Sequence, residues 1–199
     1  MRIIGRAVLG LGLGLGFGLS LAAGVGNAQQ RQLGAHEHGR GTLNLAVEGT
    51  RVSLELEVPA ADIIGFEHVA KTPRQKAAVA QAKKQLLAPQ ALFKFPGAAG
   101  CVVADASVDL EADGEHEQAK AGGEGAKASE AAEQGNHSNF HAQYSFTCKD
   151  TASITVVEFG YFQAFAGAHK LEVNVITAKG QSSFEVTRTK PRIDLAGIM

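Results

Sequence analysis

The sequence has no tryptophan, only two cysteines and two methionines, and none of several motifs that mark large functional classes. It contains no HExxH, GxSxG or CxxC motif, which are the signatures of zinc proteases, serine hydrolases and thiolate zinc sites. The methionines are Met1 and Met199, so a thioether copper(I) site is excluded. Lys and Arg form no basic stripe, and we expect no nucleic-acid partner. These absences give little support to catalysis, and we expect a protein that is not an enzyme.

The first 28 residues have the three parts of a secretion signal. Arg2 and Arg6 form a basic head, residues 7–24 form an uncharged Leu/Gly/Ala run, and Gly26-Asn27-Ala28 offers a small-x-small cleavage site. A retained membrane anchor is the alternative, but repeated glycines weaken a spanning helix and no second apolar run follows. We therefore predict cleavage after Ala28, a periplasmic location and no membrane insertion of residues 29–199, which are long enough for one domain.

Alternating apolar and polar residues predict that most of this domain is β-structure. Residues 42–58 are typical of a hairpin with a turn at Glu48-Gly49, and residues 170–188 of a second hairpin across Lys179-Gly180. Further strands are expected at residues 91–95, 101–110, 142–148 and 153–159, with a short helical turn within residues 60–70. The fold class that follows is α+β, a β-rich single domain of antiparallel hairpins with one main helix.

The main helix and a disordered insertion separate the two hairpins. Thr72-Pro73-x-Gln75 combines an N-cap, a proline at the first helical position and a capping-box partner, and the helix should continue to Ala88, before Pro89. Residues 111–136 contain no Val, Ile, Leu or aromatic residue. Such a segment cannot bury enough apolar surface to order itself, so we predict that it is disordered.

Cys101 and Cys148 lie on either side of this insertion. Thiols usually pair in an oxidising compartment, and the alternation in Tyr144-x-Phe146-x-Cys148 places Cys148 on the apolar face of its strand. We favour a disulfide, which would close a loop of about 48 residues. Two thiolate zinc ligands are the alternative interpretation, for which the spacing gives no support.

The histidines carry the main functional signal, above all in His36-Glu37-His38-Gly39. Two imidazoles one residue apart point to the same side of an extended strand, and neutral imidazole is a common zinc ligand. If the cysteines pair, histidines must supply most of a four-ligand zinc site, whose affinity should fall below pH ~6 as protons compete. Our first ligand set is His36, His38, His68 and His137, with Glu67 and His141 in reserve and His116 as a weak, mobile candidate.

Each candidate also has an interpretation without metal. His36 and His38 could be solvated near a frayed terminus, and His68 could be a core histidine that donates to a backbone carbonyl. His137 and His141 could merely border the insertion. We interpret His169 as a surface group, because the cation of Lys170 beside it disfavours metal.

A metal-independent interaction module is the second functional hypothesis. In it an aromatic cluster docks a partner protein and the histidines are incidental; the cluster is Phe159, Tyr161, Phe162 and Phe165. Ordinary core is the simpler interpretation of such a cluster.

The order of several short motifs resembles that of the ZrgA-type periplasmic zinc-binding proteins. The motifs are His36-Glu37-His38-Gly39, Leu43-Asn44-Leu45-Ala46-Val47, Gly65-Phe66-Glu67-His68, Ala91-Leu92-Phe93-x-Phe95-Pro96, Ala99-Gly100-Cys101, His137-x-x-Phe140, Tyr144-x-Phe146-x-Cys148 and Lys170-Leu171-Glu172-Val173. The resemblance implies a soluble periplasmic protein that binds zinc as cargo, for uptake or buffering, and assists a zinc ABC importer. Family members often carry a dense His/Asp-rich run in the insertion, where this chain has only His116. A single structured site built from the HEHG and GFEH segments is compatible with that loss.

Overall fold

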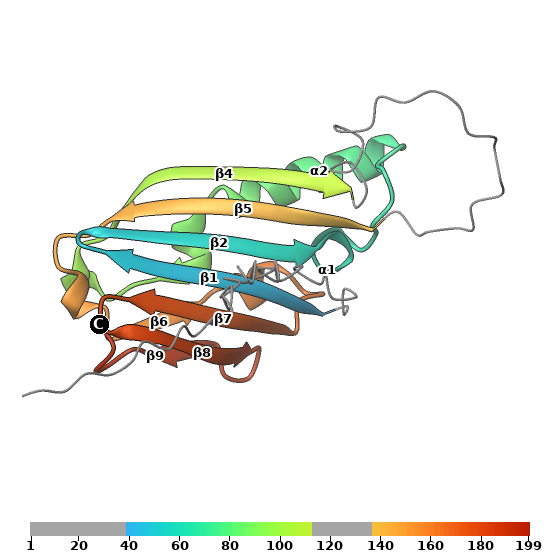
Figure 1. Ribbon diagram of the computed structural model, residues 1–199. Helices are drawn as coiled ribbons and strands as arrows, with labels where there is room; N and C mark the ends of the chain where they lie inside the picture. Colours follow the sequence, from blue (N-terminus) through green and yellow to red (C-terminus); the bar gives the residue numbers. More distant parts are fainter. Residues whose placement is uncertain (1–38, 113–136) are drawn as a thin grey trace, which may run out of the picture. The chain divides into compact units, whose positions relative to one another are not determined.

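Two β-sheets contain nearly half of the residues that the computed structural model describes, which are residues 39–112 and 137–199. Within these ranges the larger sheet has the strand order β4-β5-β2-β1-β7-β8, and the smaller sheet has the order β3-β6-β9 (Figure 1). The larger sheet consists of β1 (Arg40–Glu48), β2 (Arg51–Pro59), β4 (Val102–Ala112), β5 (Ser138–Thr147), β7 (Lys170–Thr177) and β8 (Gly180–Thr187). The smaller sheet consists of β3 (Phe93–Lys94), β6 (Val156–Phe159) and β9 (Arg192–Asp194).

The predicted main helix is present and begins as the sequence indicates. The described helices are α1 (Ala60–Ile64), α2 (Pro73–Leu86), α3 (Pro89–Leu92) and α4 (Tyr161–Ala164), with 3-10 turns η1 (Gly97–Ala99) and η2 (Thr151–Ser153). At the start of α2, Gln75 N donates to Thr72 Oγ1 at 3.2 Å and Thr72 N donates to Gln75 Oε1 at 3.0 Å, which is a capping box. The 14 residues of α2 make about four turns. No helix among the described residues is long and apolar enough to span a bilayer.

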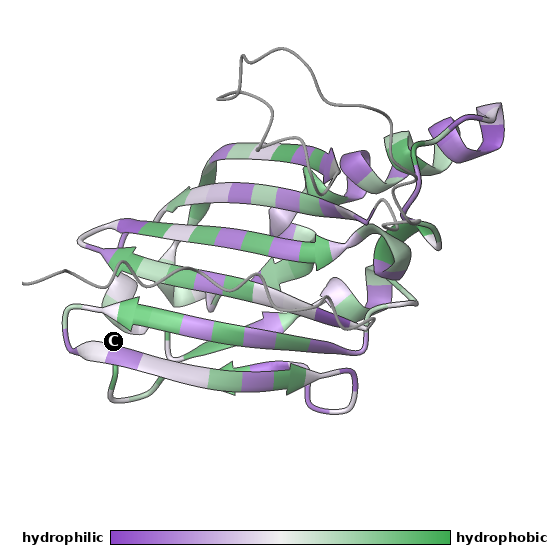
Figure 2. Cartoon of the chain, turned by 45° about the vertical axis from the view of Figure 1, so that its right-hand side comes forward, coloured by the Kyte–Doolittle hydropathy of each residue, from purple (hydrophilic) through white to green (hydrophobic). Residues whose placement is uncertain are grey.

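The period-two pattern of the strands builds one core between the two sheets. Alternating bands of hydrophilic and hydrophobic residues run along the strands in Figure 2. Leu43 of β1 pairs with Leu56 on one side and Val173 on the other, and each of the three is at most 1% exposed. The smaller sheet contributes Phe93, whose ring centroid lies 5.7 Å from that of Tyr144 on β5. The antiparallel hairpins expected from the sequence are therefore confirmed, with their apolar faces turned inward.

A parallel strand pair joins the two predicted hairpins. Strand β1 pairs with β7 in parallel, from Arg40 opposite Lys170 to Ala46 opposite Ile176, although paired residues are 130 positions apart in the sequence. Because β2 is antiparallel to both β1 and β5, the strands β1, β5 and β7 all begin at the same end of the larger sheet. This shared end becomes important for the predicted ligands.

Several element boundaries differ from the sequence prediction. Residues 91–92 belong to α3, and the predicted strand at residues 153–159 shortens to β6 because η2 occupies its start. Strand β4 extends to residue 112, two residues into the predicted insertion, since Glu111 and Ala112 pair with the early start of β5. The prediction also misses β9. Residues 1–28 and 113–136, with the predicted signal and most of the predicted insertion, lie outside the described residues.

The predicted disulfide is present. Cys101 and Cys148 are bonded with an S–S distance of 2.06 Å, and 47 residues separate them in sequence. Cys148 is 2% exposed at the end of β5, and Cys101 precedes β4, the neighbouring strand. The bond therefore joins the start of β4 to the end of β5. In the sequence, the insertion links the end of β4 to the start of β5.

Reduction of this disulfide should lower the free energy of unfolding by about 4 kcal/mol, because the unfolded chain loses a loop constraint of this length. Urea unfolding of the oxidised protein and of the same protein with a reductant measures the difference. The Cys101→Ala/Cys148→Ala variant serves as control, since the reductant should leave its unfolding midpoint unchanged. Equal stability of oxidised and reduced wild type would contradict the prediction.

The aromatic cluster that could have docked a partner is part of the core. Phe159, Phe162 and Phe165 are each 2% exposed and Tyr161 is 1% exposed. The Tyr161 ring contacts those of Phe162 and Phe165 at centroid distances of 5.3 and 5.2 Å. The docking interpretation of this cluster is therefore wrong, because a folded chain does not present these side chains to a partner.

Phe162→Ala should destabilise the protein by about 3–5 kcal/mol, the usual cost of removing a large buried ring and leaving a cavity. Leu87→Ala is the matched control, since Leu87 is 49% exposed and its loss should cost less than about 1 kcal/mol. Chemical unfolding of the two variants beside wild type gives both numbers. A stable Phe162→Ala protein would argue that this ring is not core.

Candidate metal centre

The strands that begin at the shared end of the larger sheet are each preceded by a histidine. His137 lies directly before β5 and His169 directly before β7. His38 precedes Gly39, the residue before β1, although His38 itself lies outside the described residues. Neighbouring strands lie ~4.8 Å apart, and β2 lies between β5 and β1. The start of β5 is therefore about 10 Å from the start of β1 and about 14 Å from the start of β7.

Glu67 and His137 are the two predicted ligands that the structure brings into direct contact. Glu67 Oε2 pairs with His137 Nδ1, across 70 residues of sequence. The adjacent Ser138 Oγ donates to the backbone oxygen of Glu67 at 2.6 Å, which fixes the segment after α1 to the start of β5. The Glu67 side chain is 15% exposed and that of His137 is 49% exposed. A carboxylate that accepts a hydrogen bond from Nδ1–H orients the imidazole and leaves Nε2 as the metal-binding atom.

His68, the next residue, is held by the start of α2 and not by this pair. The Oε1 atom of Gln75 accepts hydrogen bonds from Lys71 N and Thr72 N. The amide nitrogen of the same side chain, Gln75 Nε2, therefore points to His68 and donates to His68 Nε2 at 3.4 Å. The other ring nitrogen, Nδ1, then donates to Val69 O at 3.1 Å. The ring also stacks on Phe66 with a centroid distance of 5.0 Å. Both ring nitrogens thus have protein partners, and Nδ1 donates to a backbone carbonyl as the interpretation without metal expected. That interpretation also placed His68 in the core, whereas the residue is exposed.

His141 lies inside β5, on the solvent-exposed face of the larger sheet. Its register partners are Glu57 on β2 and Asp109 on β4, and its Nε2 lies 3.7 Å from Glu111 Oε2. Four residues of extended strand separate it from His137, a distance of about 13 Å. His141 therefore belongs to an acidic patch on the sheet face and does not meet the Glu67–His137 pair.

Gly39 connects the HEHG motif to the described fold. Its nitrogen donates to the buried Asp62 Oδ1 at 2.8 Å, and its carbonyl accepts from His169 N and Lys170 N at 3.0 and 2.9 Å. Gly39 has φ +84°, and a Cβ atom there would lie 2.7 Å from Cδ2 of His169. The His169 ring therefore lies directly against the residue that follows His38. Sequence reasoning missed this contact, because it depends on the parallel pairing of β1 and β7.

Asp62 is a buried carboxylate. It is 7% exposed on α1, where a Cβ on Gly167 would come within 2.5 Å of its carbonyl oxygen. Burial, and then the negative charge of Asp62, raise the pKa of the Tyr161 hydroxyl well above its ordinary value. Tyr161 therefore stays neutral beside Asp62. The carboxylate that positions Gly39 thus lies in the core and not in the exposed part of the site.

The described residues contain no complete metal site. Across residues 39–112 and 137–199, no group of three or more His, Cys, Asp or Glu side chains lies close enough to hold a metal ion. The cysteines are paired and are not thiolate ligands while that bond is intact. The remaining predicted ligands, His36, His38 and His116, lie outside the described residues.

Residues 35–195 match the model of a protein family described as ZrgA family zinc uptake protein. The chain belongs to this family. The match includes both sheets, the disulfide and the Glu67–His137 pair, and it confirms the family that the motifs indicated. No curated protein matches the chain significantly. As a ZrgA family member, the chain is a zinc uptake protein.

Gly39→Ala should lower the free energy of unfolding by about 1–3 kcal/mol, because alanine is strained at this φ and its Cβ meets the His169 ring. Gly49→Ala is the control, since Gly49 also has a positive φ but nothing lies within 4 Å of its added Cβ. The Gly39→Ala/His169→Ala double variant should recover part of the loss. Denaturant unfolding of all three variants tests this, and equal costs at Gly39 and Gly49 would exclude the contact with His169.

Proposed function

We propose that this protein is an exported zinc carrier of the periplasm that binds one zinc ion at the end of the larger sheet where β1 and β5 begin. The observation that carries the proposal is the Glu67–His137 pair, formed by two remote segments in a member of a zinc uptake family. The partner that we propose is a component of a zinc ABC importer, to which the protein passes its cargo. Residues 1–28 would act as the cleaved export signal.

In this proposal Glu67 is a positioning residue and His137 is a ligand. The carboxylate of Glu67 holds the Nδ1 side of the ring, so Nε2 of the half-exposed His137 binds the ion. This arrangement also increases the basicity of the imidazole, which strengthens its bond to zinc. Zinc enters as cargo, so an accessible ring suits capture and release better than an enclosed site does.

The HEHG motif would supply the other ligands. Gly39 is fixed by Asp62 and by the backbone of β7, at the same end of the sheet as His137. We therefore propose His36 and His38, which precede Gly39 in the sequence, as ligands beside His137. His169 is outside this set, because the start of β7 lies three strand spacings, about 14 Å, from the start of β5. His68 and His141 are outside this set, because their ring nitrogens face other partners.

Zinc binding should require the Glu67–His137 pair. Competitive zinc titration of the untagged chain without residues 1–28 should give near-stoichiometric binding, which Glu67→Gln and His137→Ala each weaken by about 10–100-fold. The double variant His36→Ala/His38→Ala should lose at least as much affinity. The matched control is His141→Ala, another half-exposed histidine with a carboxylate partner, which should bind zinc like wild type.

Two results would count against the proposal. Unchanged affinity in His137→Ala would remove the pair from the site, and a loss in His141→Ala alone would move the site to the acidic patch on the sheet face. Circular dichroism of each variant verifies that the fold is intact, so that a loss of binding reports on the ligands.

A further inference from the structure

The exposed face of α2 carries a local excess of positive charge in a chain whose net charge is −1. Residues 68–104 contain six Lys and Arg residues and no Asp or Glu. The balance of charge over the whole chain, from which we expected no basic stripe, does not reveal this segment. Five of the six cations lie on α2 or just before it, and all of them except the half-buried Lys83 are exposed: Lys71, Arg74, Lys76, Lys83 and Lys84.

The helical period separates these cations from the side of α2 that contacts the core. Ala82 and Leu86 are buried in the core, while a period of 3.6 residues places Lys76, Lys83 and Leu87 along another side of the helix. Leu87 still follows the helical geometry, since its nitrogen donates to Lys83 O at 2.9 Å, and it is 49% exposed. Cations and an exposed apolar side chain therefore share one face.

The acids of the described elements around α2 do not lie on this face. Helix α2 packs against α1, α3 and β4, the outer strand of the larger sheet (Figure 1). In α1 the acid is Asp62, which is buried, and beyond α1 the carboxylate of Glu67 pairs with His137. Helix α3 has no charged residue. The apolar residues of β4 pack against the core, so its acids lie on the other face of the sheet: Asp105, Asp109 and Glu111.

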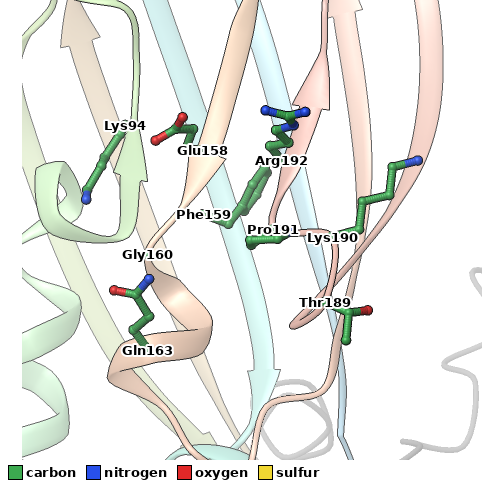
Figure 3. Close-up of a pocket in the computed structure, with 9 residues that line it drawn as sticks. All are labelled: Lys94, Glu158, Phe159, Gly160, Gln163, Thr189, Lys190, Pro191 and Arg192. Carbon is green, nitrogen blue, oxygen red and sulfur yellow. The ribbon is translucent and has the colours of Figure 1, made fainter.

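Two other groups of cations on the described surface lie beside acids. Around a hollow of about 480 Å³, Glu158 on β6 is the register partner of both Lys94 on β3 and Arg192 on β9 (Figure 3). On the larger sheet Lys170 forms an ion pair with Glu185. By comparison, no salt bridge in residues 39–112 and 137–199 involves a cation of α2 or the lysine before it. Only the α2 face among these three is of one sign.

We propose that the exposed face of α2 binds the surface of an anionic lipid bilayer, as a peripheral contact. Clusters of about four to eight Lys and Arg on an amphipathic helix are typical of binding to anionic headgroups. Val69, which is 62% exposed, and Leu87 lie near the two ends of α2, where their side chains would enter the headgroup layer.

The composition of this face favours a lipid surface over a protein or a nucleic acid. Four of the five cations are lysines, and α2 contains no aromatic residue. Protein interfaces are enriched in Arg and aromatic residues and depleted in Lys, and proteins that bind single-stranded nucleic acid stack bases on aromatic rings. Lysines are flexible, hydrated point charges, which suits attraction to many mobile headgroups.

Co-sedimentation with vesicles at low ionic strength measures the contact. The probes are vesicles of equal parts phosphatidylcholine and phosphatidylglycerol, and vesicles of phosphatidylcholine alone. The protein is the untagged chain without residues 1–28. EDTA is present throughout, so that lipid cannot bind through zinc and the result is independent of the zinc proposal. Wild type should bind the anionic vesicles at least about tenfold more tightly than the neutral ones.

Arg74→Glu/Lys76→Glu should weaken binding to the anionic vesicles at least about tenfold, since each cation near the surface contributes about fivefold. Carboxylates in the first turns of α2 interact favourably with the helix dipole, so this variant should keep its fold. Arg51→Glu/Lys179→Glu makes the same change of net charge and should bind like wild type. Both control residues are exposed and follow the ends of β1 and β7, at the opposite end of the larger sheet from the segment before α2.

The competing occupants are outcomes of the same experiment. Equal losses in the two double variants, equal binding to both kinds of vesicle, or no binding by wild type would each overturn the proposal. Release from the vesicles by inorganic phosphate at the concentration of the lipid phosphate would assign the face to a free anion. Binding of poly-glutamate without binding of the vesicles would assign it to an acidic protein.

The salt dependence of wild type provides a second test that needs no variant. Exposed charges are screened beyond the Debye length, which is about 8 Å at physiological ionic strength. Binding to the anionic vesicles should therefore weaken steadily as salt is added. Binding that added salt leaves unchanged would contradict a contact made by the cations of α2.

Discussion

The guanidinium of Arg188 fixes the turn on which the alignment of the larger sheet depends. Its nitrogens lie 2.5–3.1 Å from four backbone carbonyl oxygens, those of Phe162, Phe165, Ala166 and Ala168. These carbonyls belong to α4 and to the segment that leads into β7. The next residues, His169 and Lys170, donate to the carbonyl of Gly39 and start the parallel pairing of β1 with β7. A single side chain thus organises the entry of the C-terminal hairpin beside the N-terminal one.

The elements that the sequence predicted well are those whose signals are local. The alternation in residues 42–58 and the capping box at Thr72 depend on neighbours within a few residues, and both are confirmed. The parallel β1–β7 pair depends on Arg188 and on a contact across 130 residues, which no local pattern contains. Strand β9 is three residues long and has only Ile193 buried, so its alternation is too short to recognise.

The candidate site also combines residues that local signals predict with contacts that only the fold creates. Residue type alone identified Glu67 and His137, and the fold joins them, because α1 ends at the edge where β5 begins. Residue type could not distinguish this pair from the other candidate histidines. The ring nitrogens of His68 bond to Gln75 and Val69, and His141 lies inside β5 because that strand starts earlier than predicted. The prediction that His169 is a surface group is confirmed, since this residue is exposed. The local argument for it did not include Glu185 on β8, which forms an ion pair with Lys170 next to the ring.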